Sequence, residues 1–123
     1  MSSHRDERRQ RGLEAMSRAY GWDVQDGQGD FFGMTVDHLF AEVWTREGLS
    51  NRDRRLLLVA TTVAMGLDDV TGLQLQTALD NGDLTPDELR EIVIFLTHYV
   101  GWPRGAKLNA QIEELIARKA QGD

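Results

Sequence analysis

Residues 85–103, TPDELREIVIFLTHYVGWP, decide the fold class of this 123-residue chain. Thr85 is a good N-cap, Pro86 suits the first helical position, and Glu88 stands three residues after the cap, which completes a capping box. The apolar residues that follow recur at helical spacing, and a Gly-Trp-Pro sequence ends the segment. The run V-I-F at residues 93–95 resembles the core of a strand. The cap before it and the spacing around it predict a helix instead.

The remainder of the chain has the same helical character. Apolar residues at helical spacing, together with capping residues, predict five further helices. These helices cover residues 5–20, 35–46, 51–65, 69–80 and a last segment around residues 108–116. The glycine-rich acidic stretch at residues 22–33 predicts a loop. We therefore predict an all-α fold of about six helices. It forms a single domain over residues 1–123, with an N-terminal arm at 1–34 and a helical core at 35–120.

Charge and hydropathy exclude several partners. The formal net charge is -6, and an acidic chain gains little from contact with phosphate backbones, so we expect no nucleic acid. The first ten residues lack the apolar segment of a secretion signal. The longest apolar run, residues 56–66, is too short to cross a bilayer. These features predict a cytoplasmic protein with no membrane partner.

The chain contains no cysteine, which restricts its chemistry. Disulfides, thiolate nucleophiles and cysteine-based zinc sites are all excluded. The three histidines, His4, His38 and His98, share no spacing typical of metal ligands. We therefore expect no metal and no cofactor.

Three stretches together resemble the carboxymuconolactone decarboxylase family. They are RRQRGLEAMSRAYG at residues 8–21, AEVWTREGLSNRDRRLLLVA at 41–60 and ALDNGDLTPDELREIVIFLTHYVGWPRGAKLNA at 78–110. The resemblance implies the alkylhydroperoxidase D-like helical fold and subunits assembled as homotrimers or homohexamers, with active sites at or near subunit contacts. One branch of the family uses a C-x-x-C pair, a histidine and a glutamate relay. The other decarboxylates 4-carboxymuconolactone or a related small acid without a cofactor.

Residues that differ from the family pattern allow the possible functions to be placed in order. The redox cysteines would fall within residues 67–70, the family histidine at Gln74 and a relay glutamate near Arg55. Without a thiolate, peroxide reduction of the redox type cannot proceed, so the peroxidase function ranks last. A lyase acting on a small carboxylated lactone, within aromatic-compound catabolism, ranks first. The alternative is a non-catalytic or divergent relative that binds a small molecule, because glutamine replaces the group that would titrate near neutral pH.

Decarboxylation without a cofactor requires charge stabilisation and a proton donor. Arg54 matches the R-x-R segment of the family, and a guanidinium suits a carboxylate or an enolate. His98 is the histidine of the matched core and would supply the proton. Glu91 lies seven residues earlier, on the same helix face and roughly 10 Å along the axis. Glu91 or Gln74 would orient the reacting groups.

Trp102 and Trp44 are the candidate apolar walls of a substrate site. Each residue also has a structural alternative. The tryptophans would then be packing residues, the arginines would form surface ion pairs, His98 would be an interface residue, Glu91 an ion-pair partner and Gln74 an exposed polar side chain. The sequence leaves these alternatives open.

We predict that the chain is a homo-oligomer. Its second and last helices carry more apolar and aromatic residues than a monomer of this size can bury. Light scattering at micromolar concentration should give a multiple of the 13.9 kDa subunit mass. A mass equal to one subunit would contradict the prediction.

Overall fold

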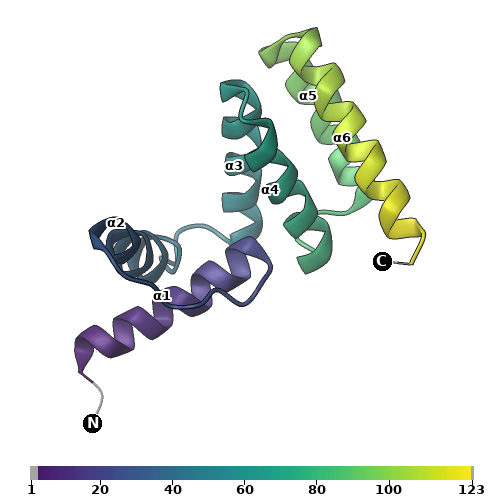
Figure 1. Cartoon of the computed structure of the whole chain (residues 1–123). Coiled ribbons are helices and arrows are strands. Elements are labelled where there is room, and N and C mark those ends of the chain that lie inside the picture. Colours follow the sequence, from purple (N-terminus) through teal and green to yellow (C-terminus); the bar gives the residue numbers. More distant parts are fainter. Residues whose placement is uncertain (1–2, 123) are drawn as a thin grey trace. The chain divides into compact units, whose positions relative to one another are not determined.

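The computed structural model describes residues 3–122 and is built from helices throughout that range (Figure 1). The elements are α1 (His4–Tyr20), α2 (Asp30–Met34), the π-helix η1 (Thr35–Val43), α3 (Asn51–Met65), α4 (Asp68–Asn81), α5 (Pro86–Val100) and α6 (Trp102–Ala120). The prediction of an all-α fold is confirmed. The chain divides between Arg54 and Arg55 into two compact units. The single-domain organisation stays a prediction.

The first unit is held together by α1 and η1. Its core consists of buried apolar side chains, namely Ala15, Met16, Ala19, Val36 and Phe40. Gly12 allows the two helices to approach closely, because a Cβ at this position would collide with the carbonyl oxygen of Val36. Glycine is therefore required at this crossing for steric reasons.

The segment after the acidic loop differs from its prediction in two ways. Helix begins at Asp30, inside the predicted loop, and residues 35–43 adopt π rather than α geometry. The N–H of Trp44 closes this segment by bonding to the carbonyl of Leu39, five residues earlier. Over so few residues, an apolar stripe fits both helix types, so the sequence pattern does not distinguish them.

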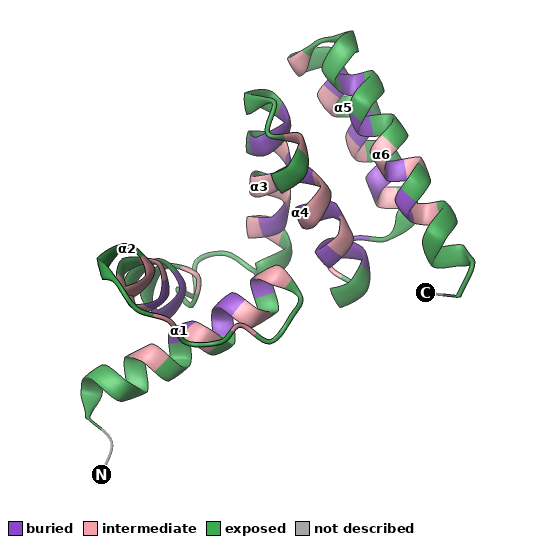
Figure 2. Cartoon of the chain, viewed as in Figure 1, coloured by how far each residue is buried: buried purple, intermediate pink, exposed green. Residues whose placement is uncertain are grey.

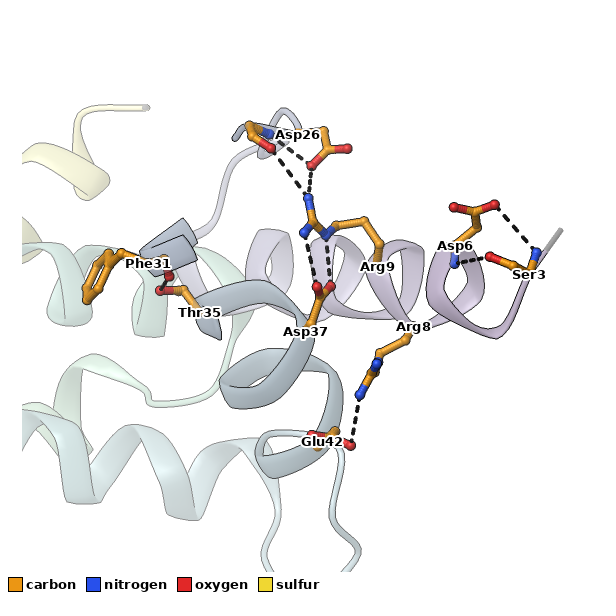
Figure 3. A network of polar contacts seen from close by, with 10 residues as sticks. Ser3, Asp6, Arg8, Arg9, Asp26, Phe31, Thr35, Asp37 and Glu42 are labelled. Carbon is orange, nitrogen blue, oxygen red and sulfur yellow. Dashed lines mark hydrogen bonds and ion pairs between the residues drawn. The ribbon is translucent and has the colours of Figure 1, made fainter. Parts of the chain in front are cut away.

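Arg9 ties three segments of the first unit together (Figure 3). Its Nε and Nη2 donate to the two carboxylate oxygens of Asp37 at 2.8 and 3.0 Å, and its Nη1 donates to Asp26 at 2.7 Å. By binding both carboxylates, Arg9 joins α1 to η1 and to the acidic loop that precedes α2. The hydrogen bonds from Arg9 lower the pKa of Asp37 below its ordinary value.

The second unit contains most of α3 together with α4, α5 and α6. Its core is formed by buried aliphatic side chains, with Val59, Leu75, Leu89, Leu108 and Ile112 at its centre. Figure 2 shows buried positions in purple along α3 to α6. The capping box predicted for α5 is confirmed, because the Thr85 hydroxyl and the Glu88 carboxylate each accept the other residue's backbone N–H. Local chemistry thus determines where α5 begins.

The last helix starts earlier than its sequence suggests. The Gly-Trp-Pro sequence that ends α5 also opens α6 at Trp102, because proline is accepted in the first turn of a helix. Gly101 has a φ of 98°, a value that favours glycine, and it reverses the chain between the two helices. None of the helices within residues 3–122 is long and apolar enough to span a membrane.

The Arg9–Asp37 pair predicts a stability that depends on acidity. A carboxyl with a depressed pKa in the folded state stabilises the fold above its unfolded pKa of about 3.9, and this contribution is lost as the pH falls through the folded value. We expect Asp37→Asn to lower the free energy of unfolding by about 1 kcal/mol at pH 7. The difference from the native chain should shrink below pH ~4.

Urea unfolding followed by tryptophan fluorescence at pH 7 and pH 3 measures this effect. Glu47→Gln is the matched control, because Glu47 is an exposed acid of the same unit. An Asp37→Asn penalty that is equally large at both pH values would show that the effect does not arise from the ion pair.

Candidate functional site

A groove lies between α5 and α6 and has a volume of about 400 Å³. The two helices follow each other directly through Gly101 and lie side by side (Figure 1). At Gly105 they come so close that a Cβ would overlap the hydroxyl of Thr97. This close approach forms the base of the groove, with room beside it for a small molecule.

The walls of the groove are mainly apolar, and its polar groups are few. Val93, Ile94 and Ala106 line it, and Trp102 stands at one end. The Trp102 ring meets His98 edge-on, with 5.8 Å between the ring centroids. Trp102 thus lies beside His98, and its role as an apolar wall of a substrate site stays a prediction.

The orientation of the His98 ring is set by its own helix. Nδ1 lies 2.7 Å from the carbonyl oxygen of Ile94. A carbonyl can only accept, so Nδ1 carries the hydrogen, and Nε2 is left for a ligand. The hydroxyl hydrogen of Thr97 is also used within α5, because it is donated to the carbonyl of Val93. The groove therefore offers two side chains with free hydrogen-bonding groups, His98 and Asn109.

The other residues that the sequence proposed for the site lie elsewhere. Glu91 is exposed and does not line this groove, and α5 and α6 are joined near its level by the ion pair between Arg90 and Glu113. Gln74 is buried on α4. Within the second unit, the structure does not bring Gln74 and Glu91 into the groove of His98. Their proposed roles stay predictions.

Arg54 and Trp44 both belong to the first unit. Two carbonyl oxygens, those of Leu49 and Arg46, accept hydrogen bonds from the Arg54 guanidinium at 2.7 and 2.8 Å. Arg54 thus stabilises the turn that precedes α3 through these two hydrogen bonds. Trp44 is half-buried and stacks on Phe40, with ring centroids 5.6 Å apart. Binding of substrate by either residue stays a prediction.

Arg55 is the charged residue whose burial the sequence did not lead us to expect. It is only 2% exposed and is the largest of the fully buried side chains. Its Nη1 donates to the amide oxygen of Gln74, and its Nε donates to Asp83 at 3.3 Å. The resemblance to the family places the relay glutamate near Arg55 and the histidine at Gln74. The two side chains are in direct contact, and the family correspondence of their positions stays a prediction.

A signal for Arg55 is present in the sequence. Val59 and Thr62, four and seven residues later, are both buried, so Arg55 continues the inward stripe of α3. A similar spacing applies to Asn109, which stands seven residues after Trp102 and therefore on the same face of α6. Arginine and asparagine are ordinarily surface residues, so a reading based on residue type alone passes over both.

The site is suited to organic acid–base chemistry. Its chemical groups are an imidazole nitrogen, a carboxamide and an apolar wall. Among residues 3–122, no three histidine, aspartate or glutamate side chains are grouped as metal ligands.

Comparison with known proteins defines the class. The sequence profile described as the carboxymuconolactone decarboxylase family matches residues 29–114, more than half of the chain. The chain therefore belongs to the carboxymuconolactone decarboxylase family. Among curated proteins it is similar to the 4-carboxymuconolactone decarboxylase of Acinetobacter baylyi (strain ATCC 33305 / BD413 / ADP1). The two are 28% identical over 119 residues, which cover 90% of this chain and 88% of the relative. No solved structure matches the chain.

The buried Arg55 predicts an asymmetry between two substitutions. Asp83→Ala leaves a buried guanidinium without its counter-charge and should cost about 3 kcal/mol of unfolding free energy. Arg55→Met removes the buried charge and keeps most of the side-chain volume, so it should cost less than Asp83→Ala. Urea unfolding measures both. Asp87→Asn, at a side chain that is 96% exposed, is the control and should cost less than about 0.5 kcal/mol.

Proposed function

We propose that the chain is a decarboxylase-like lyase that acts on a small carboxylated lactone or a related acid, without a metal or organic cofactor. The observation that carries this proposal is the His98 ring in the α5–α6 groove, with Nδ1 bonded to Ile94 and Nε2 left for a ligand. Membership of the family and similarity to a 4-carboxymuconolactone decarboxylase support the same reaction class.

The reaction follows from this arrangement. The bond between the ring carbon and the carboxylate breaks, carbon dioxide leaves, and the electron pair enters a dienolate that spreads onto the lactone carbonyl. Imidazolium at His98 then donates the proton on Nε2 to carbon and returns to the neutral form that keeps its hydrogen on Nδ1. The Ile94 carbonyl accepts from Nδ1 in both forms, so the ring need not turn during the reaction.

The apolar wall assists the loss of carbon dioxide. A carboxylate concentrates its charge on two oxygens, whereas the dienolate spreads the same charge over several atoms. Poorly solvating surroundings disfavour the concentrated charge more than the dispersed one. Val93 is buried beside His98, whereas Ile94 and Trp102 are 57% and 68% exposed, so the surroundings become poorly solvating only when a partner subunit covers this face.

A second candidate function is a divergent relative that binds a small molecule without turnover. The environment of Gln74 favours it, because the Gln74 amide oxygen accepts a hydrogen bond from Arg55 at the position where the resemblance places the family's histidine. Neither an arginine nor a glutamine exchanges a proton near neutral pH. In this alternative His98 is a structural residue.

We also propose that the functional species is a homo-oligomer, a trimer or a hexamer. One face of α5 supports the proposal, since Ile94, Phe95 and Tyr99 are 57%, 63% and 77% exposed. Large apolar side chains gathered on one helix are typical of a surface that a partner covers.

Substitution of the histidines separates the two candidate functions. His98→Gln should lower kcat on a carboxylated lactone by roughly a hundredfold, the usual contribution of one general acid. His38→Gln and His4→Gln are the controls and should leave kcat near its native value. Release of carbon dioxide, followed by a coupled assay, measures the rate.

The reverse result would favour the binding protein. If His98→Gln has no effect while Gln74→His creates or greatly increases decarboxylation, the native chain lacks its acid–base group. The α5–α6 groove would then not be the catalytic site.

A further inference from the structure

Four exposed residues form one stripe along the outer face of α5, in the order Glu91, Ile94, Phe95 and His98. Their spacing places them on the same side of the helix, because seven residues complete almost two turns. Large apolar side chains thus occupy the middle of this α5 stripe, with an acid at one end and a base at the other.

The two ends of the α5 stripe lack counter-charges within the chain. Among residues 3–122, Glu91 takes part in no hydrogen bond or ion pair, and His98 uses only Nδ1, on a carbonyl of its own helix. Glu91 and His98 are roughly 10 Å apart along the axis, which is too far for contact. Arg90, the residue before Glu91, already pairs with Glu113. The residues of α6 that line the groove beside His98 are uncharged, namely Trp102, Gly105, Ala106 and Asn109.

A second copy of the chain supplies both counter-charges if two α5 stripes pack in antiparallel orientation. A two-fold axis between residues 94 and 95 places each Glu91 opposite His98 of the partner subunit, because the two residues lie at equal distances on either side of that axis. The same axis brings Ile94 and Phe95 against their own copies and removes these apolar side chains from water. A parallel arrangement would instead set acid against acid, which is electrostatically unfavourable.

We propose that a second copy of this chain binds the α5 stripe in antiparallel orientation and that Glu91 of the partner subunit completes the His98 site. The inference rests on the proposed function, because it adds a positioning residue to that same reaction. A carboxylate within about 4–6 Å favours the imidazolium, which is the form that donates the proton, and it does not have to occupy Nε2 to do so. A two-fold contact fits a dimer or a hexamer and excludes an isolated trimer.

The same contact changes the solvent exposure of the groove. Ile94 and His98 belong both to the α5 stripe and to the lining of the α5–α6 groove. A partner subunit that covers them removes water from one edge of the groove. Electrostatic interactions inside the groove are then less screened, so the carboxylate of the partner acts more strongly on the imidazole.

Disulfide trapping tests the packing without requiring turnover. The native chain has no cysteine, so Glu91→Cys/His98→Cys introduces the only two thiols. Within one chain these positions are roughly 10 Å apart, beyond the span of a disulfide, so oxidation can join them only between subunits. We expect mild oxidation of the full chain to give a covalent dimer of twice the 13.9 kDa subunit mass on a non-reducing gel. Glu91→Cys/Glu114→Cys is the matched control and should give little dimer, since Glu114 is an exposed acid of α6 outside the α5 stripe.

Complementation between two variants tests the positioning role. Glu91→Gln should lower kcat on a carboxylated lactone by about tenfold with little change in KM, at protein concentrations where the variant remains associated. A purely structural role of Glu91 would leave kcat unchanged under these conditions. Glu91→Gln mixed in equal amounts with His98→Gln, after subunit exchange, should recover about a quarter of the native rate, because half of the subunits enter mixed pairs and each mixed pair has one complete site. Glu91→Gln mixed with Glu91→Gln/His98→Gln is the control and should recover nothing, since neither chain supplies Glu91.

Several results would overturn the inference. One is the absence of a covalent dimer of Glu91→Cys/His98→Cys at concentrations where light scattering shows that this variant is associated. Another is a native mass of one subunit, which would leave the α5 stripe to a different occupant. An unchanged kcat of Glu91→Gln, or a mixture no more active than its separate components, would also refute it. Failure of the proposed function is a different outcome, namely a covalent dimer that forms as expected from a chain whose native form decarboxylates no carboxylated lactone.

Discussion

The buried guanidinium of Arg55 is the constraint on which the second unit depends. A charge in the interior is tolerated only when it is paired and hydrogen-bonded, and Arg55 meets this condition through Asp83 and Gln74. These partners come from the turn after α4 and from α4 itself, while Arg55 is on α3. The cluster therefore fixes two helices and the start of the connection to α5.

The position of that connection determines the position of the candidate site. Asp83 lies two residues before Thr85, whose capping box starts α5. From that start, the helical repeat carries His98 to the last turn of α5, beside the reversal at Gly101. A displacement of the Arg55 cluster would therefore shift the entry of α5, although the cluster does not touch the groove. Stability and site geometry are linked through this short segment.

The same cluster bears on how the chain departs from its family. The resemblance places a relay glutamate near Arg55 and a histidine at Gln74, and in this chain a guanidinium and an amide bonded to it stand there. Neither of these two side chains exchanges a proton near neutral pH. The proposed function therefore takes its acid–base chemistry from the His98 groove, where an imidazole is placed with a free nitrogen.

The sequence by itself determined the helical class, the family and the main helix boundaries, because these depend on local chemistry. The capping box at Thr85 and the αL glycine after Tyr20 operate within a few residues. Only the tertiary structure decided which polar side chains meet. Successive helix positions differ by about 100° in direction, so packing alone decides that Arg55 faces the interior while Arg54 fastens a turn. The same holds for His98 and Asn109, since they share a groove only because Gly105 lets α6 approach Thr97 on α5.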